Sequence, residues 1–122
     1  MNLNSILIGS ENPQGLADYY GKLFGKPAFE DQDNGFHSWQ IGSGWLSVGP
    51  HDQVKGKNDE SGRVMWNLET SDVKGDFEKL KAAGATVVRD PYQPGGPPDM
   101  PEMWIATFSD PDNNYFQLIS SM

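Results

Sequence analysis

The sequence predicts an α+β fold in which two tandem βαβββ modules form a half-open barrel from one chain of 122 residues. Three observations predict this fold. Apolar residues recur at helical spacing in two segments, and each segment ends at a glycine. Short runs rich in β-branched and aromatic residues flank both segments. The order of elements in the second half repeats that of the first half, although residue identity between the halves is slight.

The first half, about residues 1–50, begins with a short apolar segment typical of a strand, which polar residues and Pro13 end. A helix is expected over about residues 15–24, because Leu16 and Leu23 recur at helical spacing and Gly25 is a typical helix stop. The strands expected in this half cover residues 5–8, 27–30, 36–41 and 45–49.

A polar segment without periodicity, residues 51–62, is interpreted as the linker between the modules. The second module then covers about residues 63–122, and its helix presents Val73 and Phe77 on one face before Gly84 ends it. The Pro- and Gly-rich stretch from Pro91 to Pro101 is expected to be an irregular loop. The strands expected in this half cover residues 64–69, 85–89, 103–109 and 115–119, with a turn at 110–114.

Composition and charge argue against several classes of function. Lys and Arg total 9 against 17 acidic residues, so the chain lacks the basic face of a nucleic-acid-binding protein. It has no Cys, which excludes thiolate metal sites and a Cys nucleophile. No apolar run approaches the ~20 residues that cross a bilayer, and the first ten residues do not resemble a signal peptide. We therefore expect a cytoplasmic protein that does not bind membranes.

The predicted elements imply a specific layered architecture. Each sheet must cover one face with the helix of its module, and the other face is then free to curl toward the partner sheet. Two curved sheets facing each other form a half-open barrel with a cleft, which is a natural site for a small molecule.

Three segments carry a resemblance to a known family. Residues 16–25 are similar to its first helix, with an aromatic pair, Leu, a spacer and Gly. Residues 77–85 are similar to its second helix and glycine stop, and residues 108–118 to its closing hairpin, which is the most specific of the three. With the βαβββ repeat, the chain resembles the glyoxalase/bleomycin-resistance/dioxygenase superfamily, also called vicinal oxygen chelate proteins. The resemblance spans almost the whole chain.

The resemblance implies four inward-pointing strand positions where metal-using relatives place His or carboxylate ligands. Counted from the matching elements, these positions fall at Ser5, Ser47, Met65 and Gln117. A hydroxyl, a thioether and an amide bind divalent cations poorly. A shift by one residue does not supply better ligands. The sequence therefore predicts no metal at these positions and no cofactor.

The remaining ionisable candidates have simpler interpretations. His51 follows Pro50 and is expected at the surface, while His37 lies in a strand as an edge or core histidine with a hydrogen bond. A new metal site of His37 with a nearby acid is the alternative. Asp110 and Asp112 resemble a catalytic pair, but they are better explained as turn residues.

Because side chains alternate along a strand, each of the four positions shares its face with the residue two places away. These added residues are Leu7, Trp45, Asn67 and Tyr115. Trp104 follows the loop that ends at Pro101, and it is interpreted either as a core residue or as one that closes over a ligand. The loop itself is interpreted either as a lid or as a surface excursion without a role. The expected ligand-binding residues are Ser5, Leu7, Trp45, Ser47, Met65, Asn67, Trp104, Tyr115 and Gln117.

Three functions are compatible with this cleft. The first is a metal-independent protein that sequesters or senses a small organic molecule, as bleomycin-resistance relatives do. The second is a glyoxalase-like lyase, isomerase or dioxygenase, either metal-free or with an unexpected metal site. The third is an interaction module with an empty cleft. By analogy with the family, we expect a homodimer.

Overall fold

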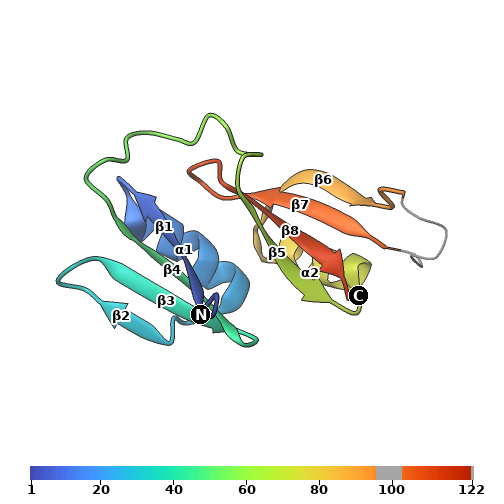
Figure 1. Ribbon diagram of the computed structural model, residues 1–122, viewed down its shortest axis with the longest axis horizontal. Helices are drawn as coiled ribbons and strands as arrows, with labels where there is room; N and C mark the ends of the chain where they lie inside the picture. Colours follow the sequence, from blue (N-terminus) through green and yellow to red (C-terminus); the bar gives the residue numbers. More distant parts are fainter. Residues whose placement is uncertain (96–102, 122) are drawn as a thin grey trace. The chain divides into compact units, whose positions relative to one another are not determined.

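The computed structural model describes residues 1–95 and 103–121. These residues form two helices and eight strands in the order β1-α1-β2-β3-β4-β5-α2-β6-β7-β8 (Figure 1). The chain divides into two compact units, Met1–Lys57 and Asn58–Met122. Each unit combines one helix with one four-stranded sheet, and neither sheet closes into a ring. The predicted α+β fold with two βαβββ modules is confirmed.

The first unit contains a mixed sheet in the order β1-β4-β3-β2. Strand β1 pairs with β4 in parallel, and the other two pairs are antiparallel. The parallel pair requires a crossover, which α1 and the β2–β3 hairpin supply. The elements are β1 (Ser5–Ser10), α1 (Pro13–Phe24), β2 (Phe29–Asp31), β3 (Phe36–Ile41) and β4 (Gly44–Pro50).

Helix α1 begins two residues earlier than expected. Asn12 is its N-cap, and the side-chain oxygen of Asn12 accepts a hydrogen bond from the backbone N–H of Gly15 at 3.2 Å. Pro13 occupies the first turn of the helix, where a backbone N–H would have no acceptor within the helix, so proline costs no hydrogen bond there. Proline therefore starts this helix, although the sequence pattern suggested that it only ends the preceding strand.

Helix α1 covers one face of the first sheet. Leu16 and Tyr20 of the helix are fully buried, and Leu46 and Val48 of β4 are buried on the facing side of the sheet. The indole N–H of Trp39 donates to the carbonyl of Gly25 at 2.8 Å, which ties β3 to the end of α1. These contacts form the core of the first unit and leave the opposite face of the sheet without a helix of its own unit.

The second unit repeats this arrangement in the order β5-β8-β7-β6. Strand β5 pairs with β8 in parallel, and β6, β7 and β8 pair antiparallel. Asp72 caps α2 by accepting from the N–H of Gly75 at 3.0 Å, as Asn12 caps α1. The elements are β5 (Met65–Thr70), α2 (Val73–Ala83), β6 (Thr86–Tyr92), β7 (Ile105–Ser109) and β8 (Tyr115–Ser120).

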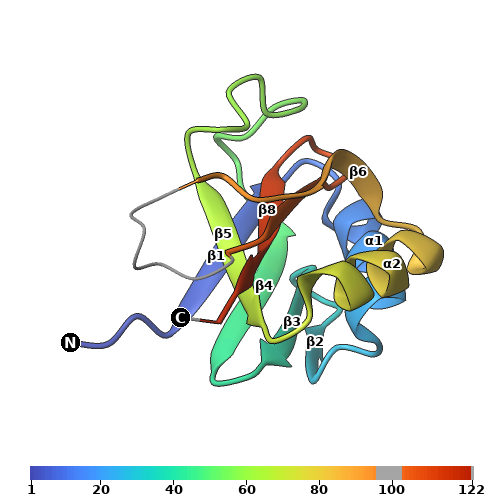
Figure 2. The same ribbon diagram turned by 90° about the vertical axis from the view of Figure 1, so that its right-hand side faces the viewer.

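The core of the second unit is a series of stacked aromatic rings. Trp66 stacks on Phe116 with ring centroids 4.8 Å apart, Phe116 on Phe108 at 5.3 Å, and Phe108 on Phe77 of α2 at 5.4 Å. Helix α2 lies to one side of β5 and β8 (Figure 2). Through this series of rings, Trp66 packs on the side of the sheet that α2 covers.

Strand β6 corrects one sequence prediction. The irregular loop was expected to begin at Pro91, but β6 continues through Pro91 to Tyr92. Proline is tolerated there because β6 is the edge strand, whose outward N–H groups have no ladder partner. The expected loop residues 96–101 lie outside the described residues.

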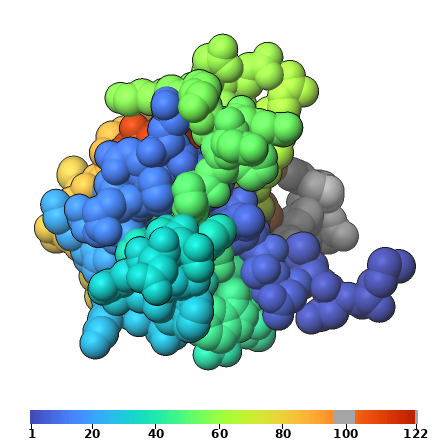
Figure 3. Space-filling view, turned by 90° about the vertical axis from the view of Figure 1, so that its left-hand side faces the viewer, coloured from blue at the N-terminus to red at the C-terminus, as the bar shows by residue number. Residues whose placement is uncertain are grey.

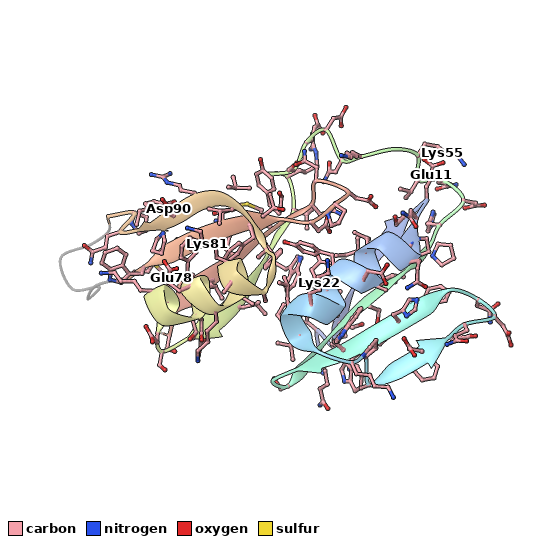
Figure 4. All side chains as sticks on the ribbon, turned by 180° about the vertical axis from the view of Figure 1, so that it is seen from behind. Glu11, Lys22, Lys55, Glu78, Lys81 and Asp90 are labelled. Atoms are coloured by element: carbon pink, nitrogen blue, oxygen red, sulfur yellow. The ribbon has the colours of Figure 1, made fainter. Side chains whose placement is uncertain are left out.

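The expected linker, residues 51–62, is attached to both units. The carboxylate of Glu11 accepts a hydrogen bond from the N–H of Gly56 at 2.6 Å and lies 3.9 Å from the ammonium of Lys55; Figure 4 labels both side chains. On the other side, the N–H of Asn58 donates to the carbonyl of Asp112 at 2.8 Å. The division between Lys57 and Asn58 thus falls inside the expected linker.

The first four residues precede β1 and extend away from the rest of the first unit (Figure 3), with Met1 and Leu3 exposed. Within the parts of the chain that the structure describes, neither helix has the length and apolar character needed to cross a membrane.

Candidate binding site

The predicted ligand-binding residues of the first unit share the sheet face that α1 does not cover, called here the first helix-free face. Ser5 pairs with Trp45, and Leu7 pairs with Ser47, across the parallel β1–β4 ladder. Laterally paired residues point to the same side of a sheet. Leu7 is 59 % exposed, so this face presents apolar surface beside the polar residues.

A hydroxyl pair lies in the middle of the first helix-free face. Ser38 of β3 is the register partner of Ser47, and their Oγ atoms are 2.7 Å apart. Sequence reasoning did not select Ser38, although alternation within residues 36–41 places it on this face. The Ser47 hydroxyl is therefore engaged by a neighbouring side chain.

The second helix-free face, on the side of the second sheet away from α2, holds the other four residues of the predicted set. Met65 pairs with Tyr115, and Asn67 pairs with Gln117. The side-chain amide of Gln117 donates to the hydroxyl of Thr107 at 3.1 Å. Thr107, which sequence reasoning also missed, is only 6 % exposed. A hydrogen-bonded polar pair thus lies at corresponding places on both sheets.

Trp104 lies elsewhere in the second unit. Its backbone N–H donates to the hydroxyl of Ser120 at 2.8 Å, and its ring lies 3.8 Å from the ammonium of Lys74 on α2. Both contacts hold Trp104 at the end of the sheet beside the start of α2. The structure does not bring it together with Tyr115 and Gln117.

The four positions implied for metal ligands do not fit a divalent metal. Ser47 and Gln117 form hydrogen bonds with neighbouring side chains, and Ser5 and Met65 offer a hydroxyl and a thioether. None of the four carries the imidazole or carboxylate that such an ion prefers. Over residues 1–95 and 103–121, His, Cys, Asp and Glu side chains form no group of three that could hold a metal.

The histidines lie apart from both helix-free faces. His37 is 5 % exposed, and its Nδ1 lies 3.3 Å from a carboxylate oxygen of Glu30. It shares a register pair with Val48, on the side that α1 covers. His51 is exposed, and its Nδ1 accepts from the N–H of Gln53 at 3.1 Å. The expectation of a core histidine with a hydrogen bond and a surface histidine is confirmed.

The carboxylate of Asp110 shapes the β7–β8 turn. Its Oδ1 accepts the backbone N–H groups of Asp112 and Asn114, both at 2.9 Å. Asn113 adopts the left-handed conformation with φ of 64°, which asparagine tolerates in a turn. Asp110 is therefore a turn residue.

Both helix-free faces combine neutral hydrogen-bonding groups with flat or flexible apolar side chains. Hydroxyl and amide groups orient a ligand, while Trp45, Tyr115 and Met65 offer contact area to its apolar part. Such side chains can form hydrogen bonds and apolar contacts with a molecule that has both polar and apolar surface.

Comparisons with known proteins agree with this architecture. The Glyoxalase-like domain family matches residues 5–119 of the chain. A glyoxalase-related enzyme from Fulvimarina pelagi is 19 % identical, with a TM-score of 0.71, over 99 % of this chain and 88 % of that one. A glyoxalase/bleomycin resistance protein/dioxygenase superfamily member from Sphaerobacter thermophilus is 20 % identical, with a TM-score of 0.72, over 99 % and 98 %.

A glyoxalase/bleomycin resistance protein/dioxygenase family enzyme from Burkholderia phytofirmans is 18 % identical, with a TM-score of 0.67, over the full length of both chains. At these identities the likeness demonstrates a shared fold. No curated protein matches the chain.

Proposed function

The chain belongs to the glyoxalase-like domain family of the glyoxalase/bleomycin-resistance/dioxygenase superfamily, and from this premise we propose that it is a metal-independent small-molecule-binding protein. It sequesters or senses a small organic ligand. Each helix-free face is by itself a candidate contact surface: the first offers Ser5, Leu7, Trp45 and Ser47, and the second offers Met65, Asn67, Tyr115 and Gln117.

One observation supports this proposal above the others. The positions implied for metal ligands hold Ser5, Ser47, Met65 and Gln117, and two of these already form hydrogen bonds with neighbouring side chains. The polarisation of a substrate by a metal ion, which metal-using relatives employ, has no ligand set here. The aromatic and amide side chains that remain are suited to holding a ligand.

Binding and turnover are separated by one experiment. The purified protein is incubated with a small-molecule library, bound compounds are found by thermal shift, and each is recovered and weighed by mass spectrometry. We expect a bound compound to be recovered unchanged, because none of the eight proposed contact residues carries a carboxylate, an imidazole or a thiol that could activate it. A chemically altered compound would favour the alternative, a glyoxalase-like lyase, isomerase or dioxygenase.

Elemental analysis of the same preparation tests metal independence. We expect no stoichiometric zinc, nickel, iron or manganese after dialysis, and no loss of ligand binding after treatment with a chelator. A transition metal retained at one ion per chain, and lost in a Gln117→Ala variant, would contradict the proposal.

The proposal includes two broader expectations. A homodimer is expected by analogy with the family. The second is a cytoplasmic location. Cell fractionation of the tagged protein tests the second expectation.

A further inference from the structure

Strand β6 departs twice from regular pairing with β7. Val87 pairs with Phe108, so regular antiparallel pairing would place Val88 opposite Thr107, but Arg89 occupies that place. Counting on from Arg89, regular pairing would place Pro91 opposite Ile105, but Tyr92 is the residue opposite Ile105. Each shift adds one residue to β6, and such bulges change which side chains point to a given face. Arg89 and Tyr92 consequently share the second helix-free face.

The guanidinium of Arg89 is oriented by this arrangement. Its central carbon lies 3.4 Å from the centroid of the Tyr92 ring, a cation–π contact. In regular pairing these residues, three apart, would point to opposite faces. Arg89 is exposed, and in the parts of the chain that the structure describes no carboxylate forms an ion pair with it. Its hydrogen-bonding edge is available to an external anion.

Arg89 is one end of a row of polar side chains that crosses the whole sheet. The register pairs Arg89 with Thr107, Thr107 with Gln117, and Gln117 with Asn67, one residue from each strand. Neighbouring strands are about 4.8 Å apart, so adjacent members of the row can hold one polar group together. We call these four residues the polar row.

The polar row is rich in hydrogen-bond donors. The Thr107 hydroxyl accepts from Gln117, so its own proton is free to be donated. Asn67 is exposed and offers an amide N–H₂, and the Arg89 guanidinium offers a planar pair of donors. A planar oxyanion that accepts two parallel hydrogen bonds matches such a guanidinium.

The corresponding row of the first sheet has different chemistry. It runs from Phe29 through Ser38 and Ser47 to Leu7. Phe29 and Leu7 are 57 % and 59 % exposed, and no member is charged. Because both sheets share one strand order, the cation is a property of the polar row and not of the fold.

The charge on the second helix-free face favours an anion with a single charge. Arg89 supplies one positive charge, and Glu69, exposed two residues after Asn67 on β5, supplies one negative charge on the same face. A phosphate with two negative charges would keep one of them unbalanced near Glu69. The single negative charge of a carboxylate is balanced by the one guanidinium. Tyr115, two residues before Gln117 on β8, offers a ring to the apolar part of the ligand.

We propose that the polar row binds the carboxylate of a small aromatic or amphipathic organic acid. Arg89 is the residue that recognises the charge of the acid, and Tyr92 is the residue that positions the Arg89 guanidinium. This inference rests on the proposed function, since it names the chemical class of the ligand for the second helix-free face.

The test compares matched probes on matched variants by isothermal titration calorimetry. The probes are aromatic monocarboxylates, naphthalene-2-carboxylate among them, each paired with its primary amide and with the aryl phosphate of the same ring. The variants are Arg89→Gln and Arg63→Gln, which remove the only two arginines of the chain one at a time. Arg63 is exposed and paired with Glu60 at 2.6 Å outside the polar row, so its variant controls for lost charge.

We expect the carboxylates to bind about tenfold or more tightly than their amides, because hydrogen bonds to an ionised group are stronger than those to a neutral one. Arg89→Gln should remove this preference, and Arg63→Gln should retain it. A preference for the aryl phosphates, or equal losses in both variants, would overturn the assignment of a carboxylate to Arg89.

Failure of this inference is distinguishable from failure of the proposed function. Amides that bind as tightly as the acids, with the same affinity in Arg89→Gln, would refute the polar row and leave small-molecule binding intact. Binding of no probe of any kind would count against both. The melting temperature of Arg89→Gln should stay close to that of Arg63→Gln, which shows that lost affinity does not reflect unfolding.

Discussion

Asp110 illustrates how the surroundings of a side chain decide its role. The residue is 5 % exposed, and its two carboxylate oxygens accept hydrogen bonds from backbone and side-chain groups of the turn that follows. A carboxylate occupied by such donors cannot readily transfer protons to a ligand. The residues after it can turn back to form β8 because its acceptors satisfy their N–H groups.

The Asp110→Ala variant should lower the free energy of unfolding by about 2–3 kcal/mol, because it leaves the part-buried donors of Asp112 and Asn114 without this acceptor. Urea denaturation measures the loss. Asp33→Ala, at an exposed position of the β2–β3 turn, should change stability by less than about 0.5 kcal/mol. Similar losses in both variants would show that Asp110 does not organise its turn.

Asp31 provides a prediction about pH. Hydrogen bonds from the side chain and the backbone N–H of Asn34 hold the pKa of Asp31 below its ordinary value. A lowered pKa in the folded state means stability that is present above the ordinary pKa of aspartate and lost as the pH falls through the folded value. In Asn34→Ala, an NMR titration should find the pKa of Asp31 raised toward its ordinary value.

At the scale of the secondary-structure elements, two glycines differ in whether a side chain would fit: Gly21 in α1 and Gly49 in β4. A methyl group at Gly21 in α1 would contact nothing within 4 Å. At Gly49 in β4, it would lie 2.3 Å from the ring of Phe36 on the neighbouring strand β3. The helix tolerates a side chain at this glycine, whereas the strand needs the space for an aromatic ring.

Gly21→Ala should raise the free energy of unfolding by about 0.5–1 kcal/mol, because alanine restricts the unfolded chain and favours the helix. Gly49→Ala should lower it by about 1–3 kcal/mol through overpacking against Phe36. Chemical denaturation of both variants, followed by circular dichroism, gives the two values. A stabilised Gly49→Ala protein would show that the ring moves aside without cost.

For the molecule as a whole, the two units raise the question of assembly. Each sheet has a face that its own helix does not cover, and the chain carries a net charge of −8, which favours solubility. Family analogy rather than a contact in this chain motivates the expected homodimer.

Light scattering coupled to size exclusion should report about twice the 13.5 kDa mass of the chain. Since dissociation accompanies the unfolding of a dimer, its melting temperature should also rise with protein concentration. A particle with the mass of one chain, and a melting temperature independent of concentration, would refute the dimer.

The regular elements of the fold were predictable because their signals are local. Residues 36–41 were assigned as a strand with the observed bounds, and α2 was found from Val73, Phe77 and the glycine that follows it. Alternation alone grouped Asn67 with Met65, and Gln117 with Tyr115, on one side of their strands. These predictions needed only the periodicity of a helix or strand and the conformational limits of glycine.

The sequence by itself determined the repeated α+β architecture, and its family resemblance predicted weak metal ligands at Ser5, Ser47, Met65 and Gln117. Only the tertiary structure decided that Ser38 and Thr107 complete the polar pairs, and that Arg89 rather than Val88 lies beside Thr107. The reason is physical. Alternation is a property of a single strand and can be read from local sequence. A bulge or a lateral neighbour depends on how two strands distant in sequence pair, and no local pattern predicts that pairing.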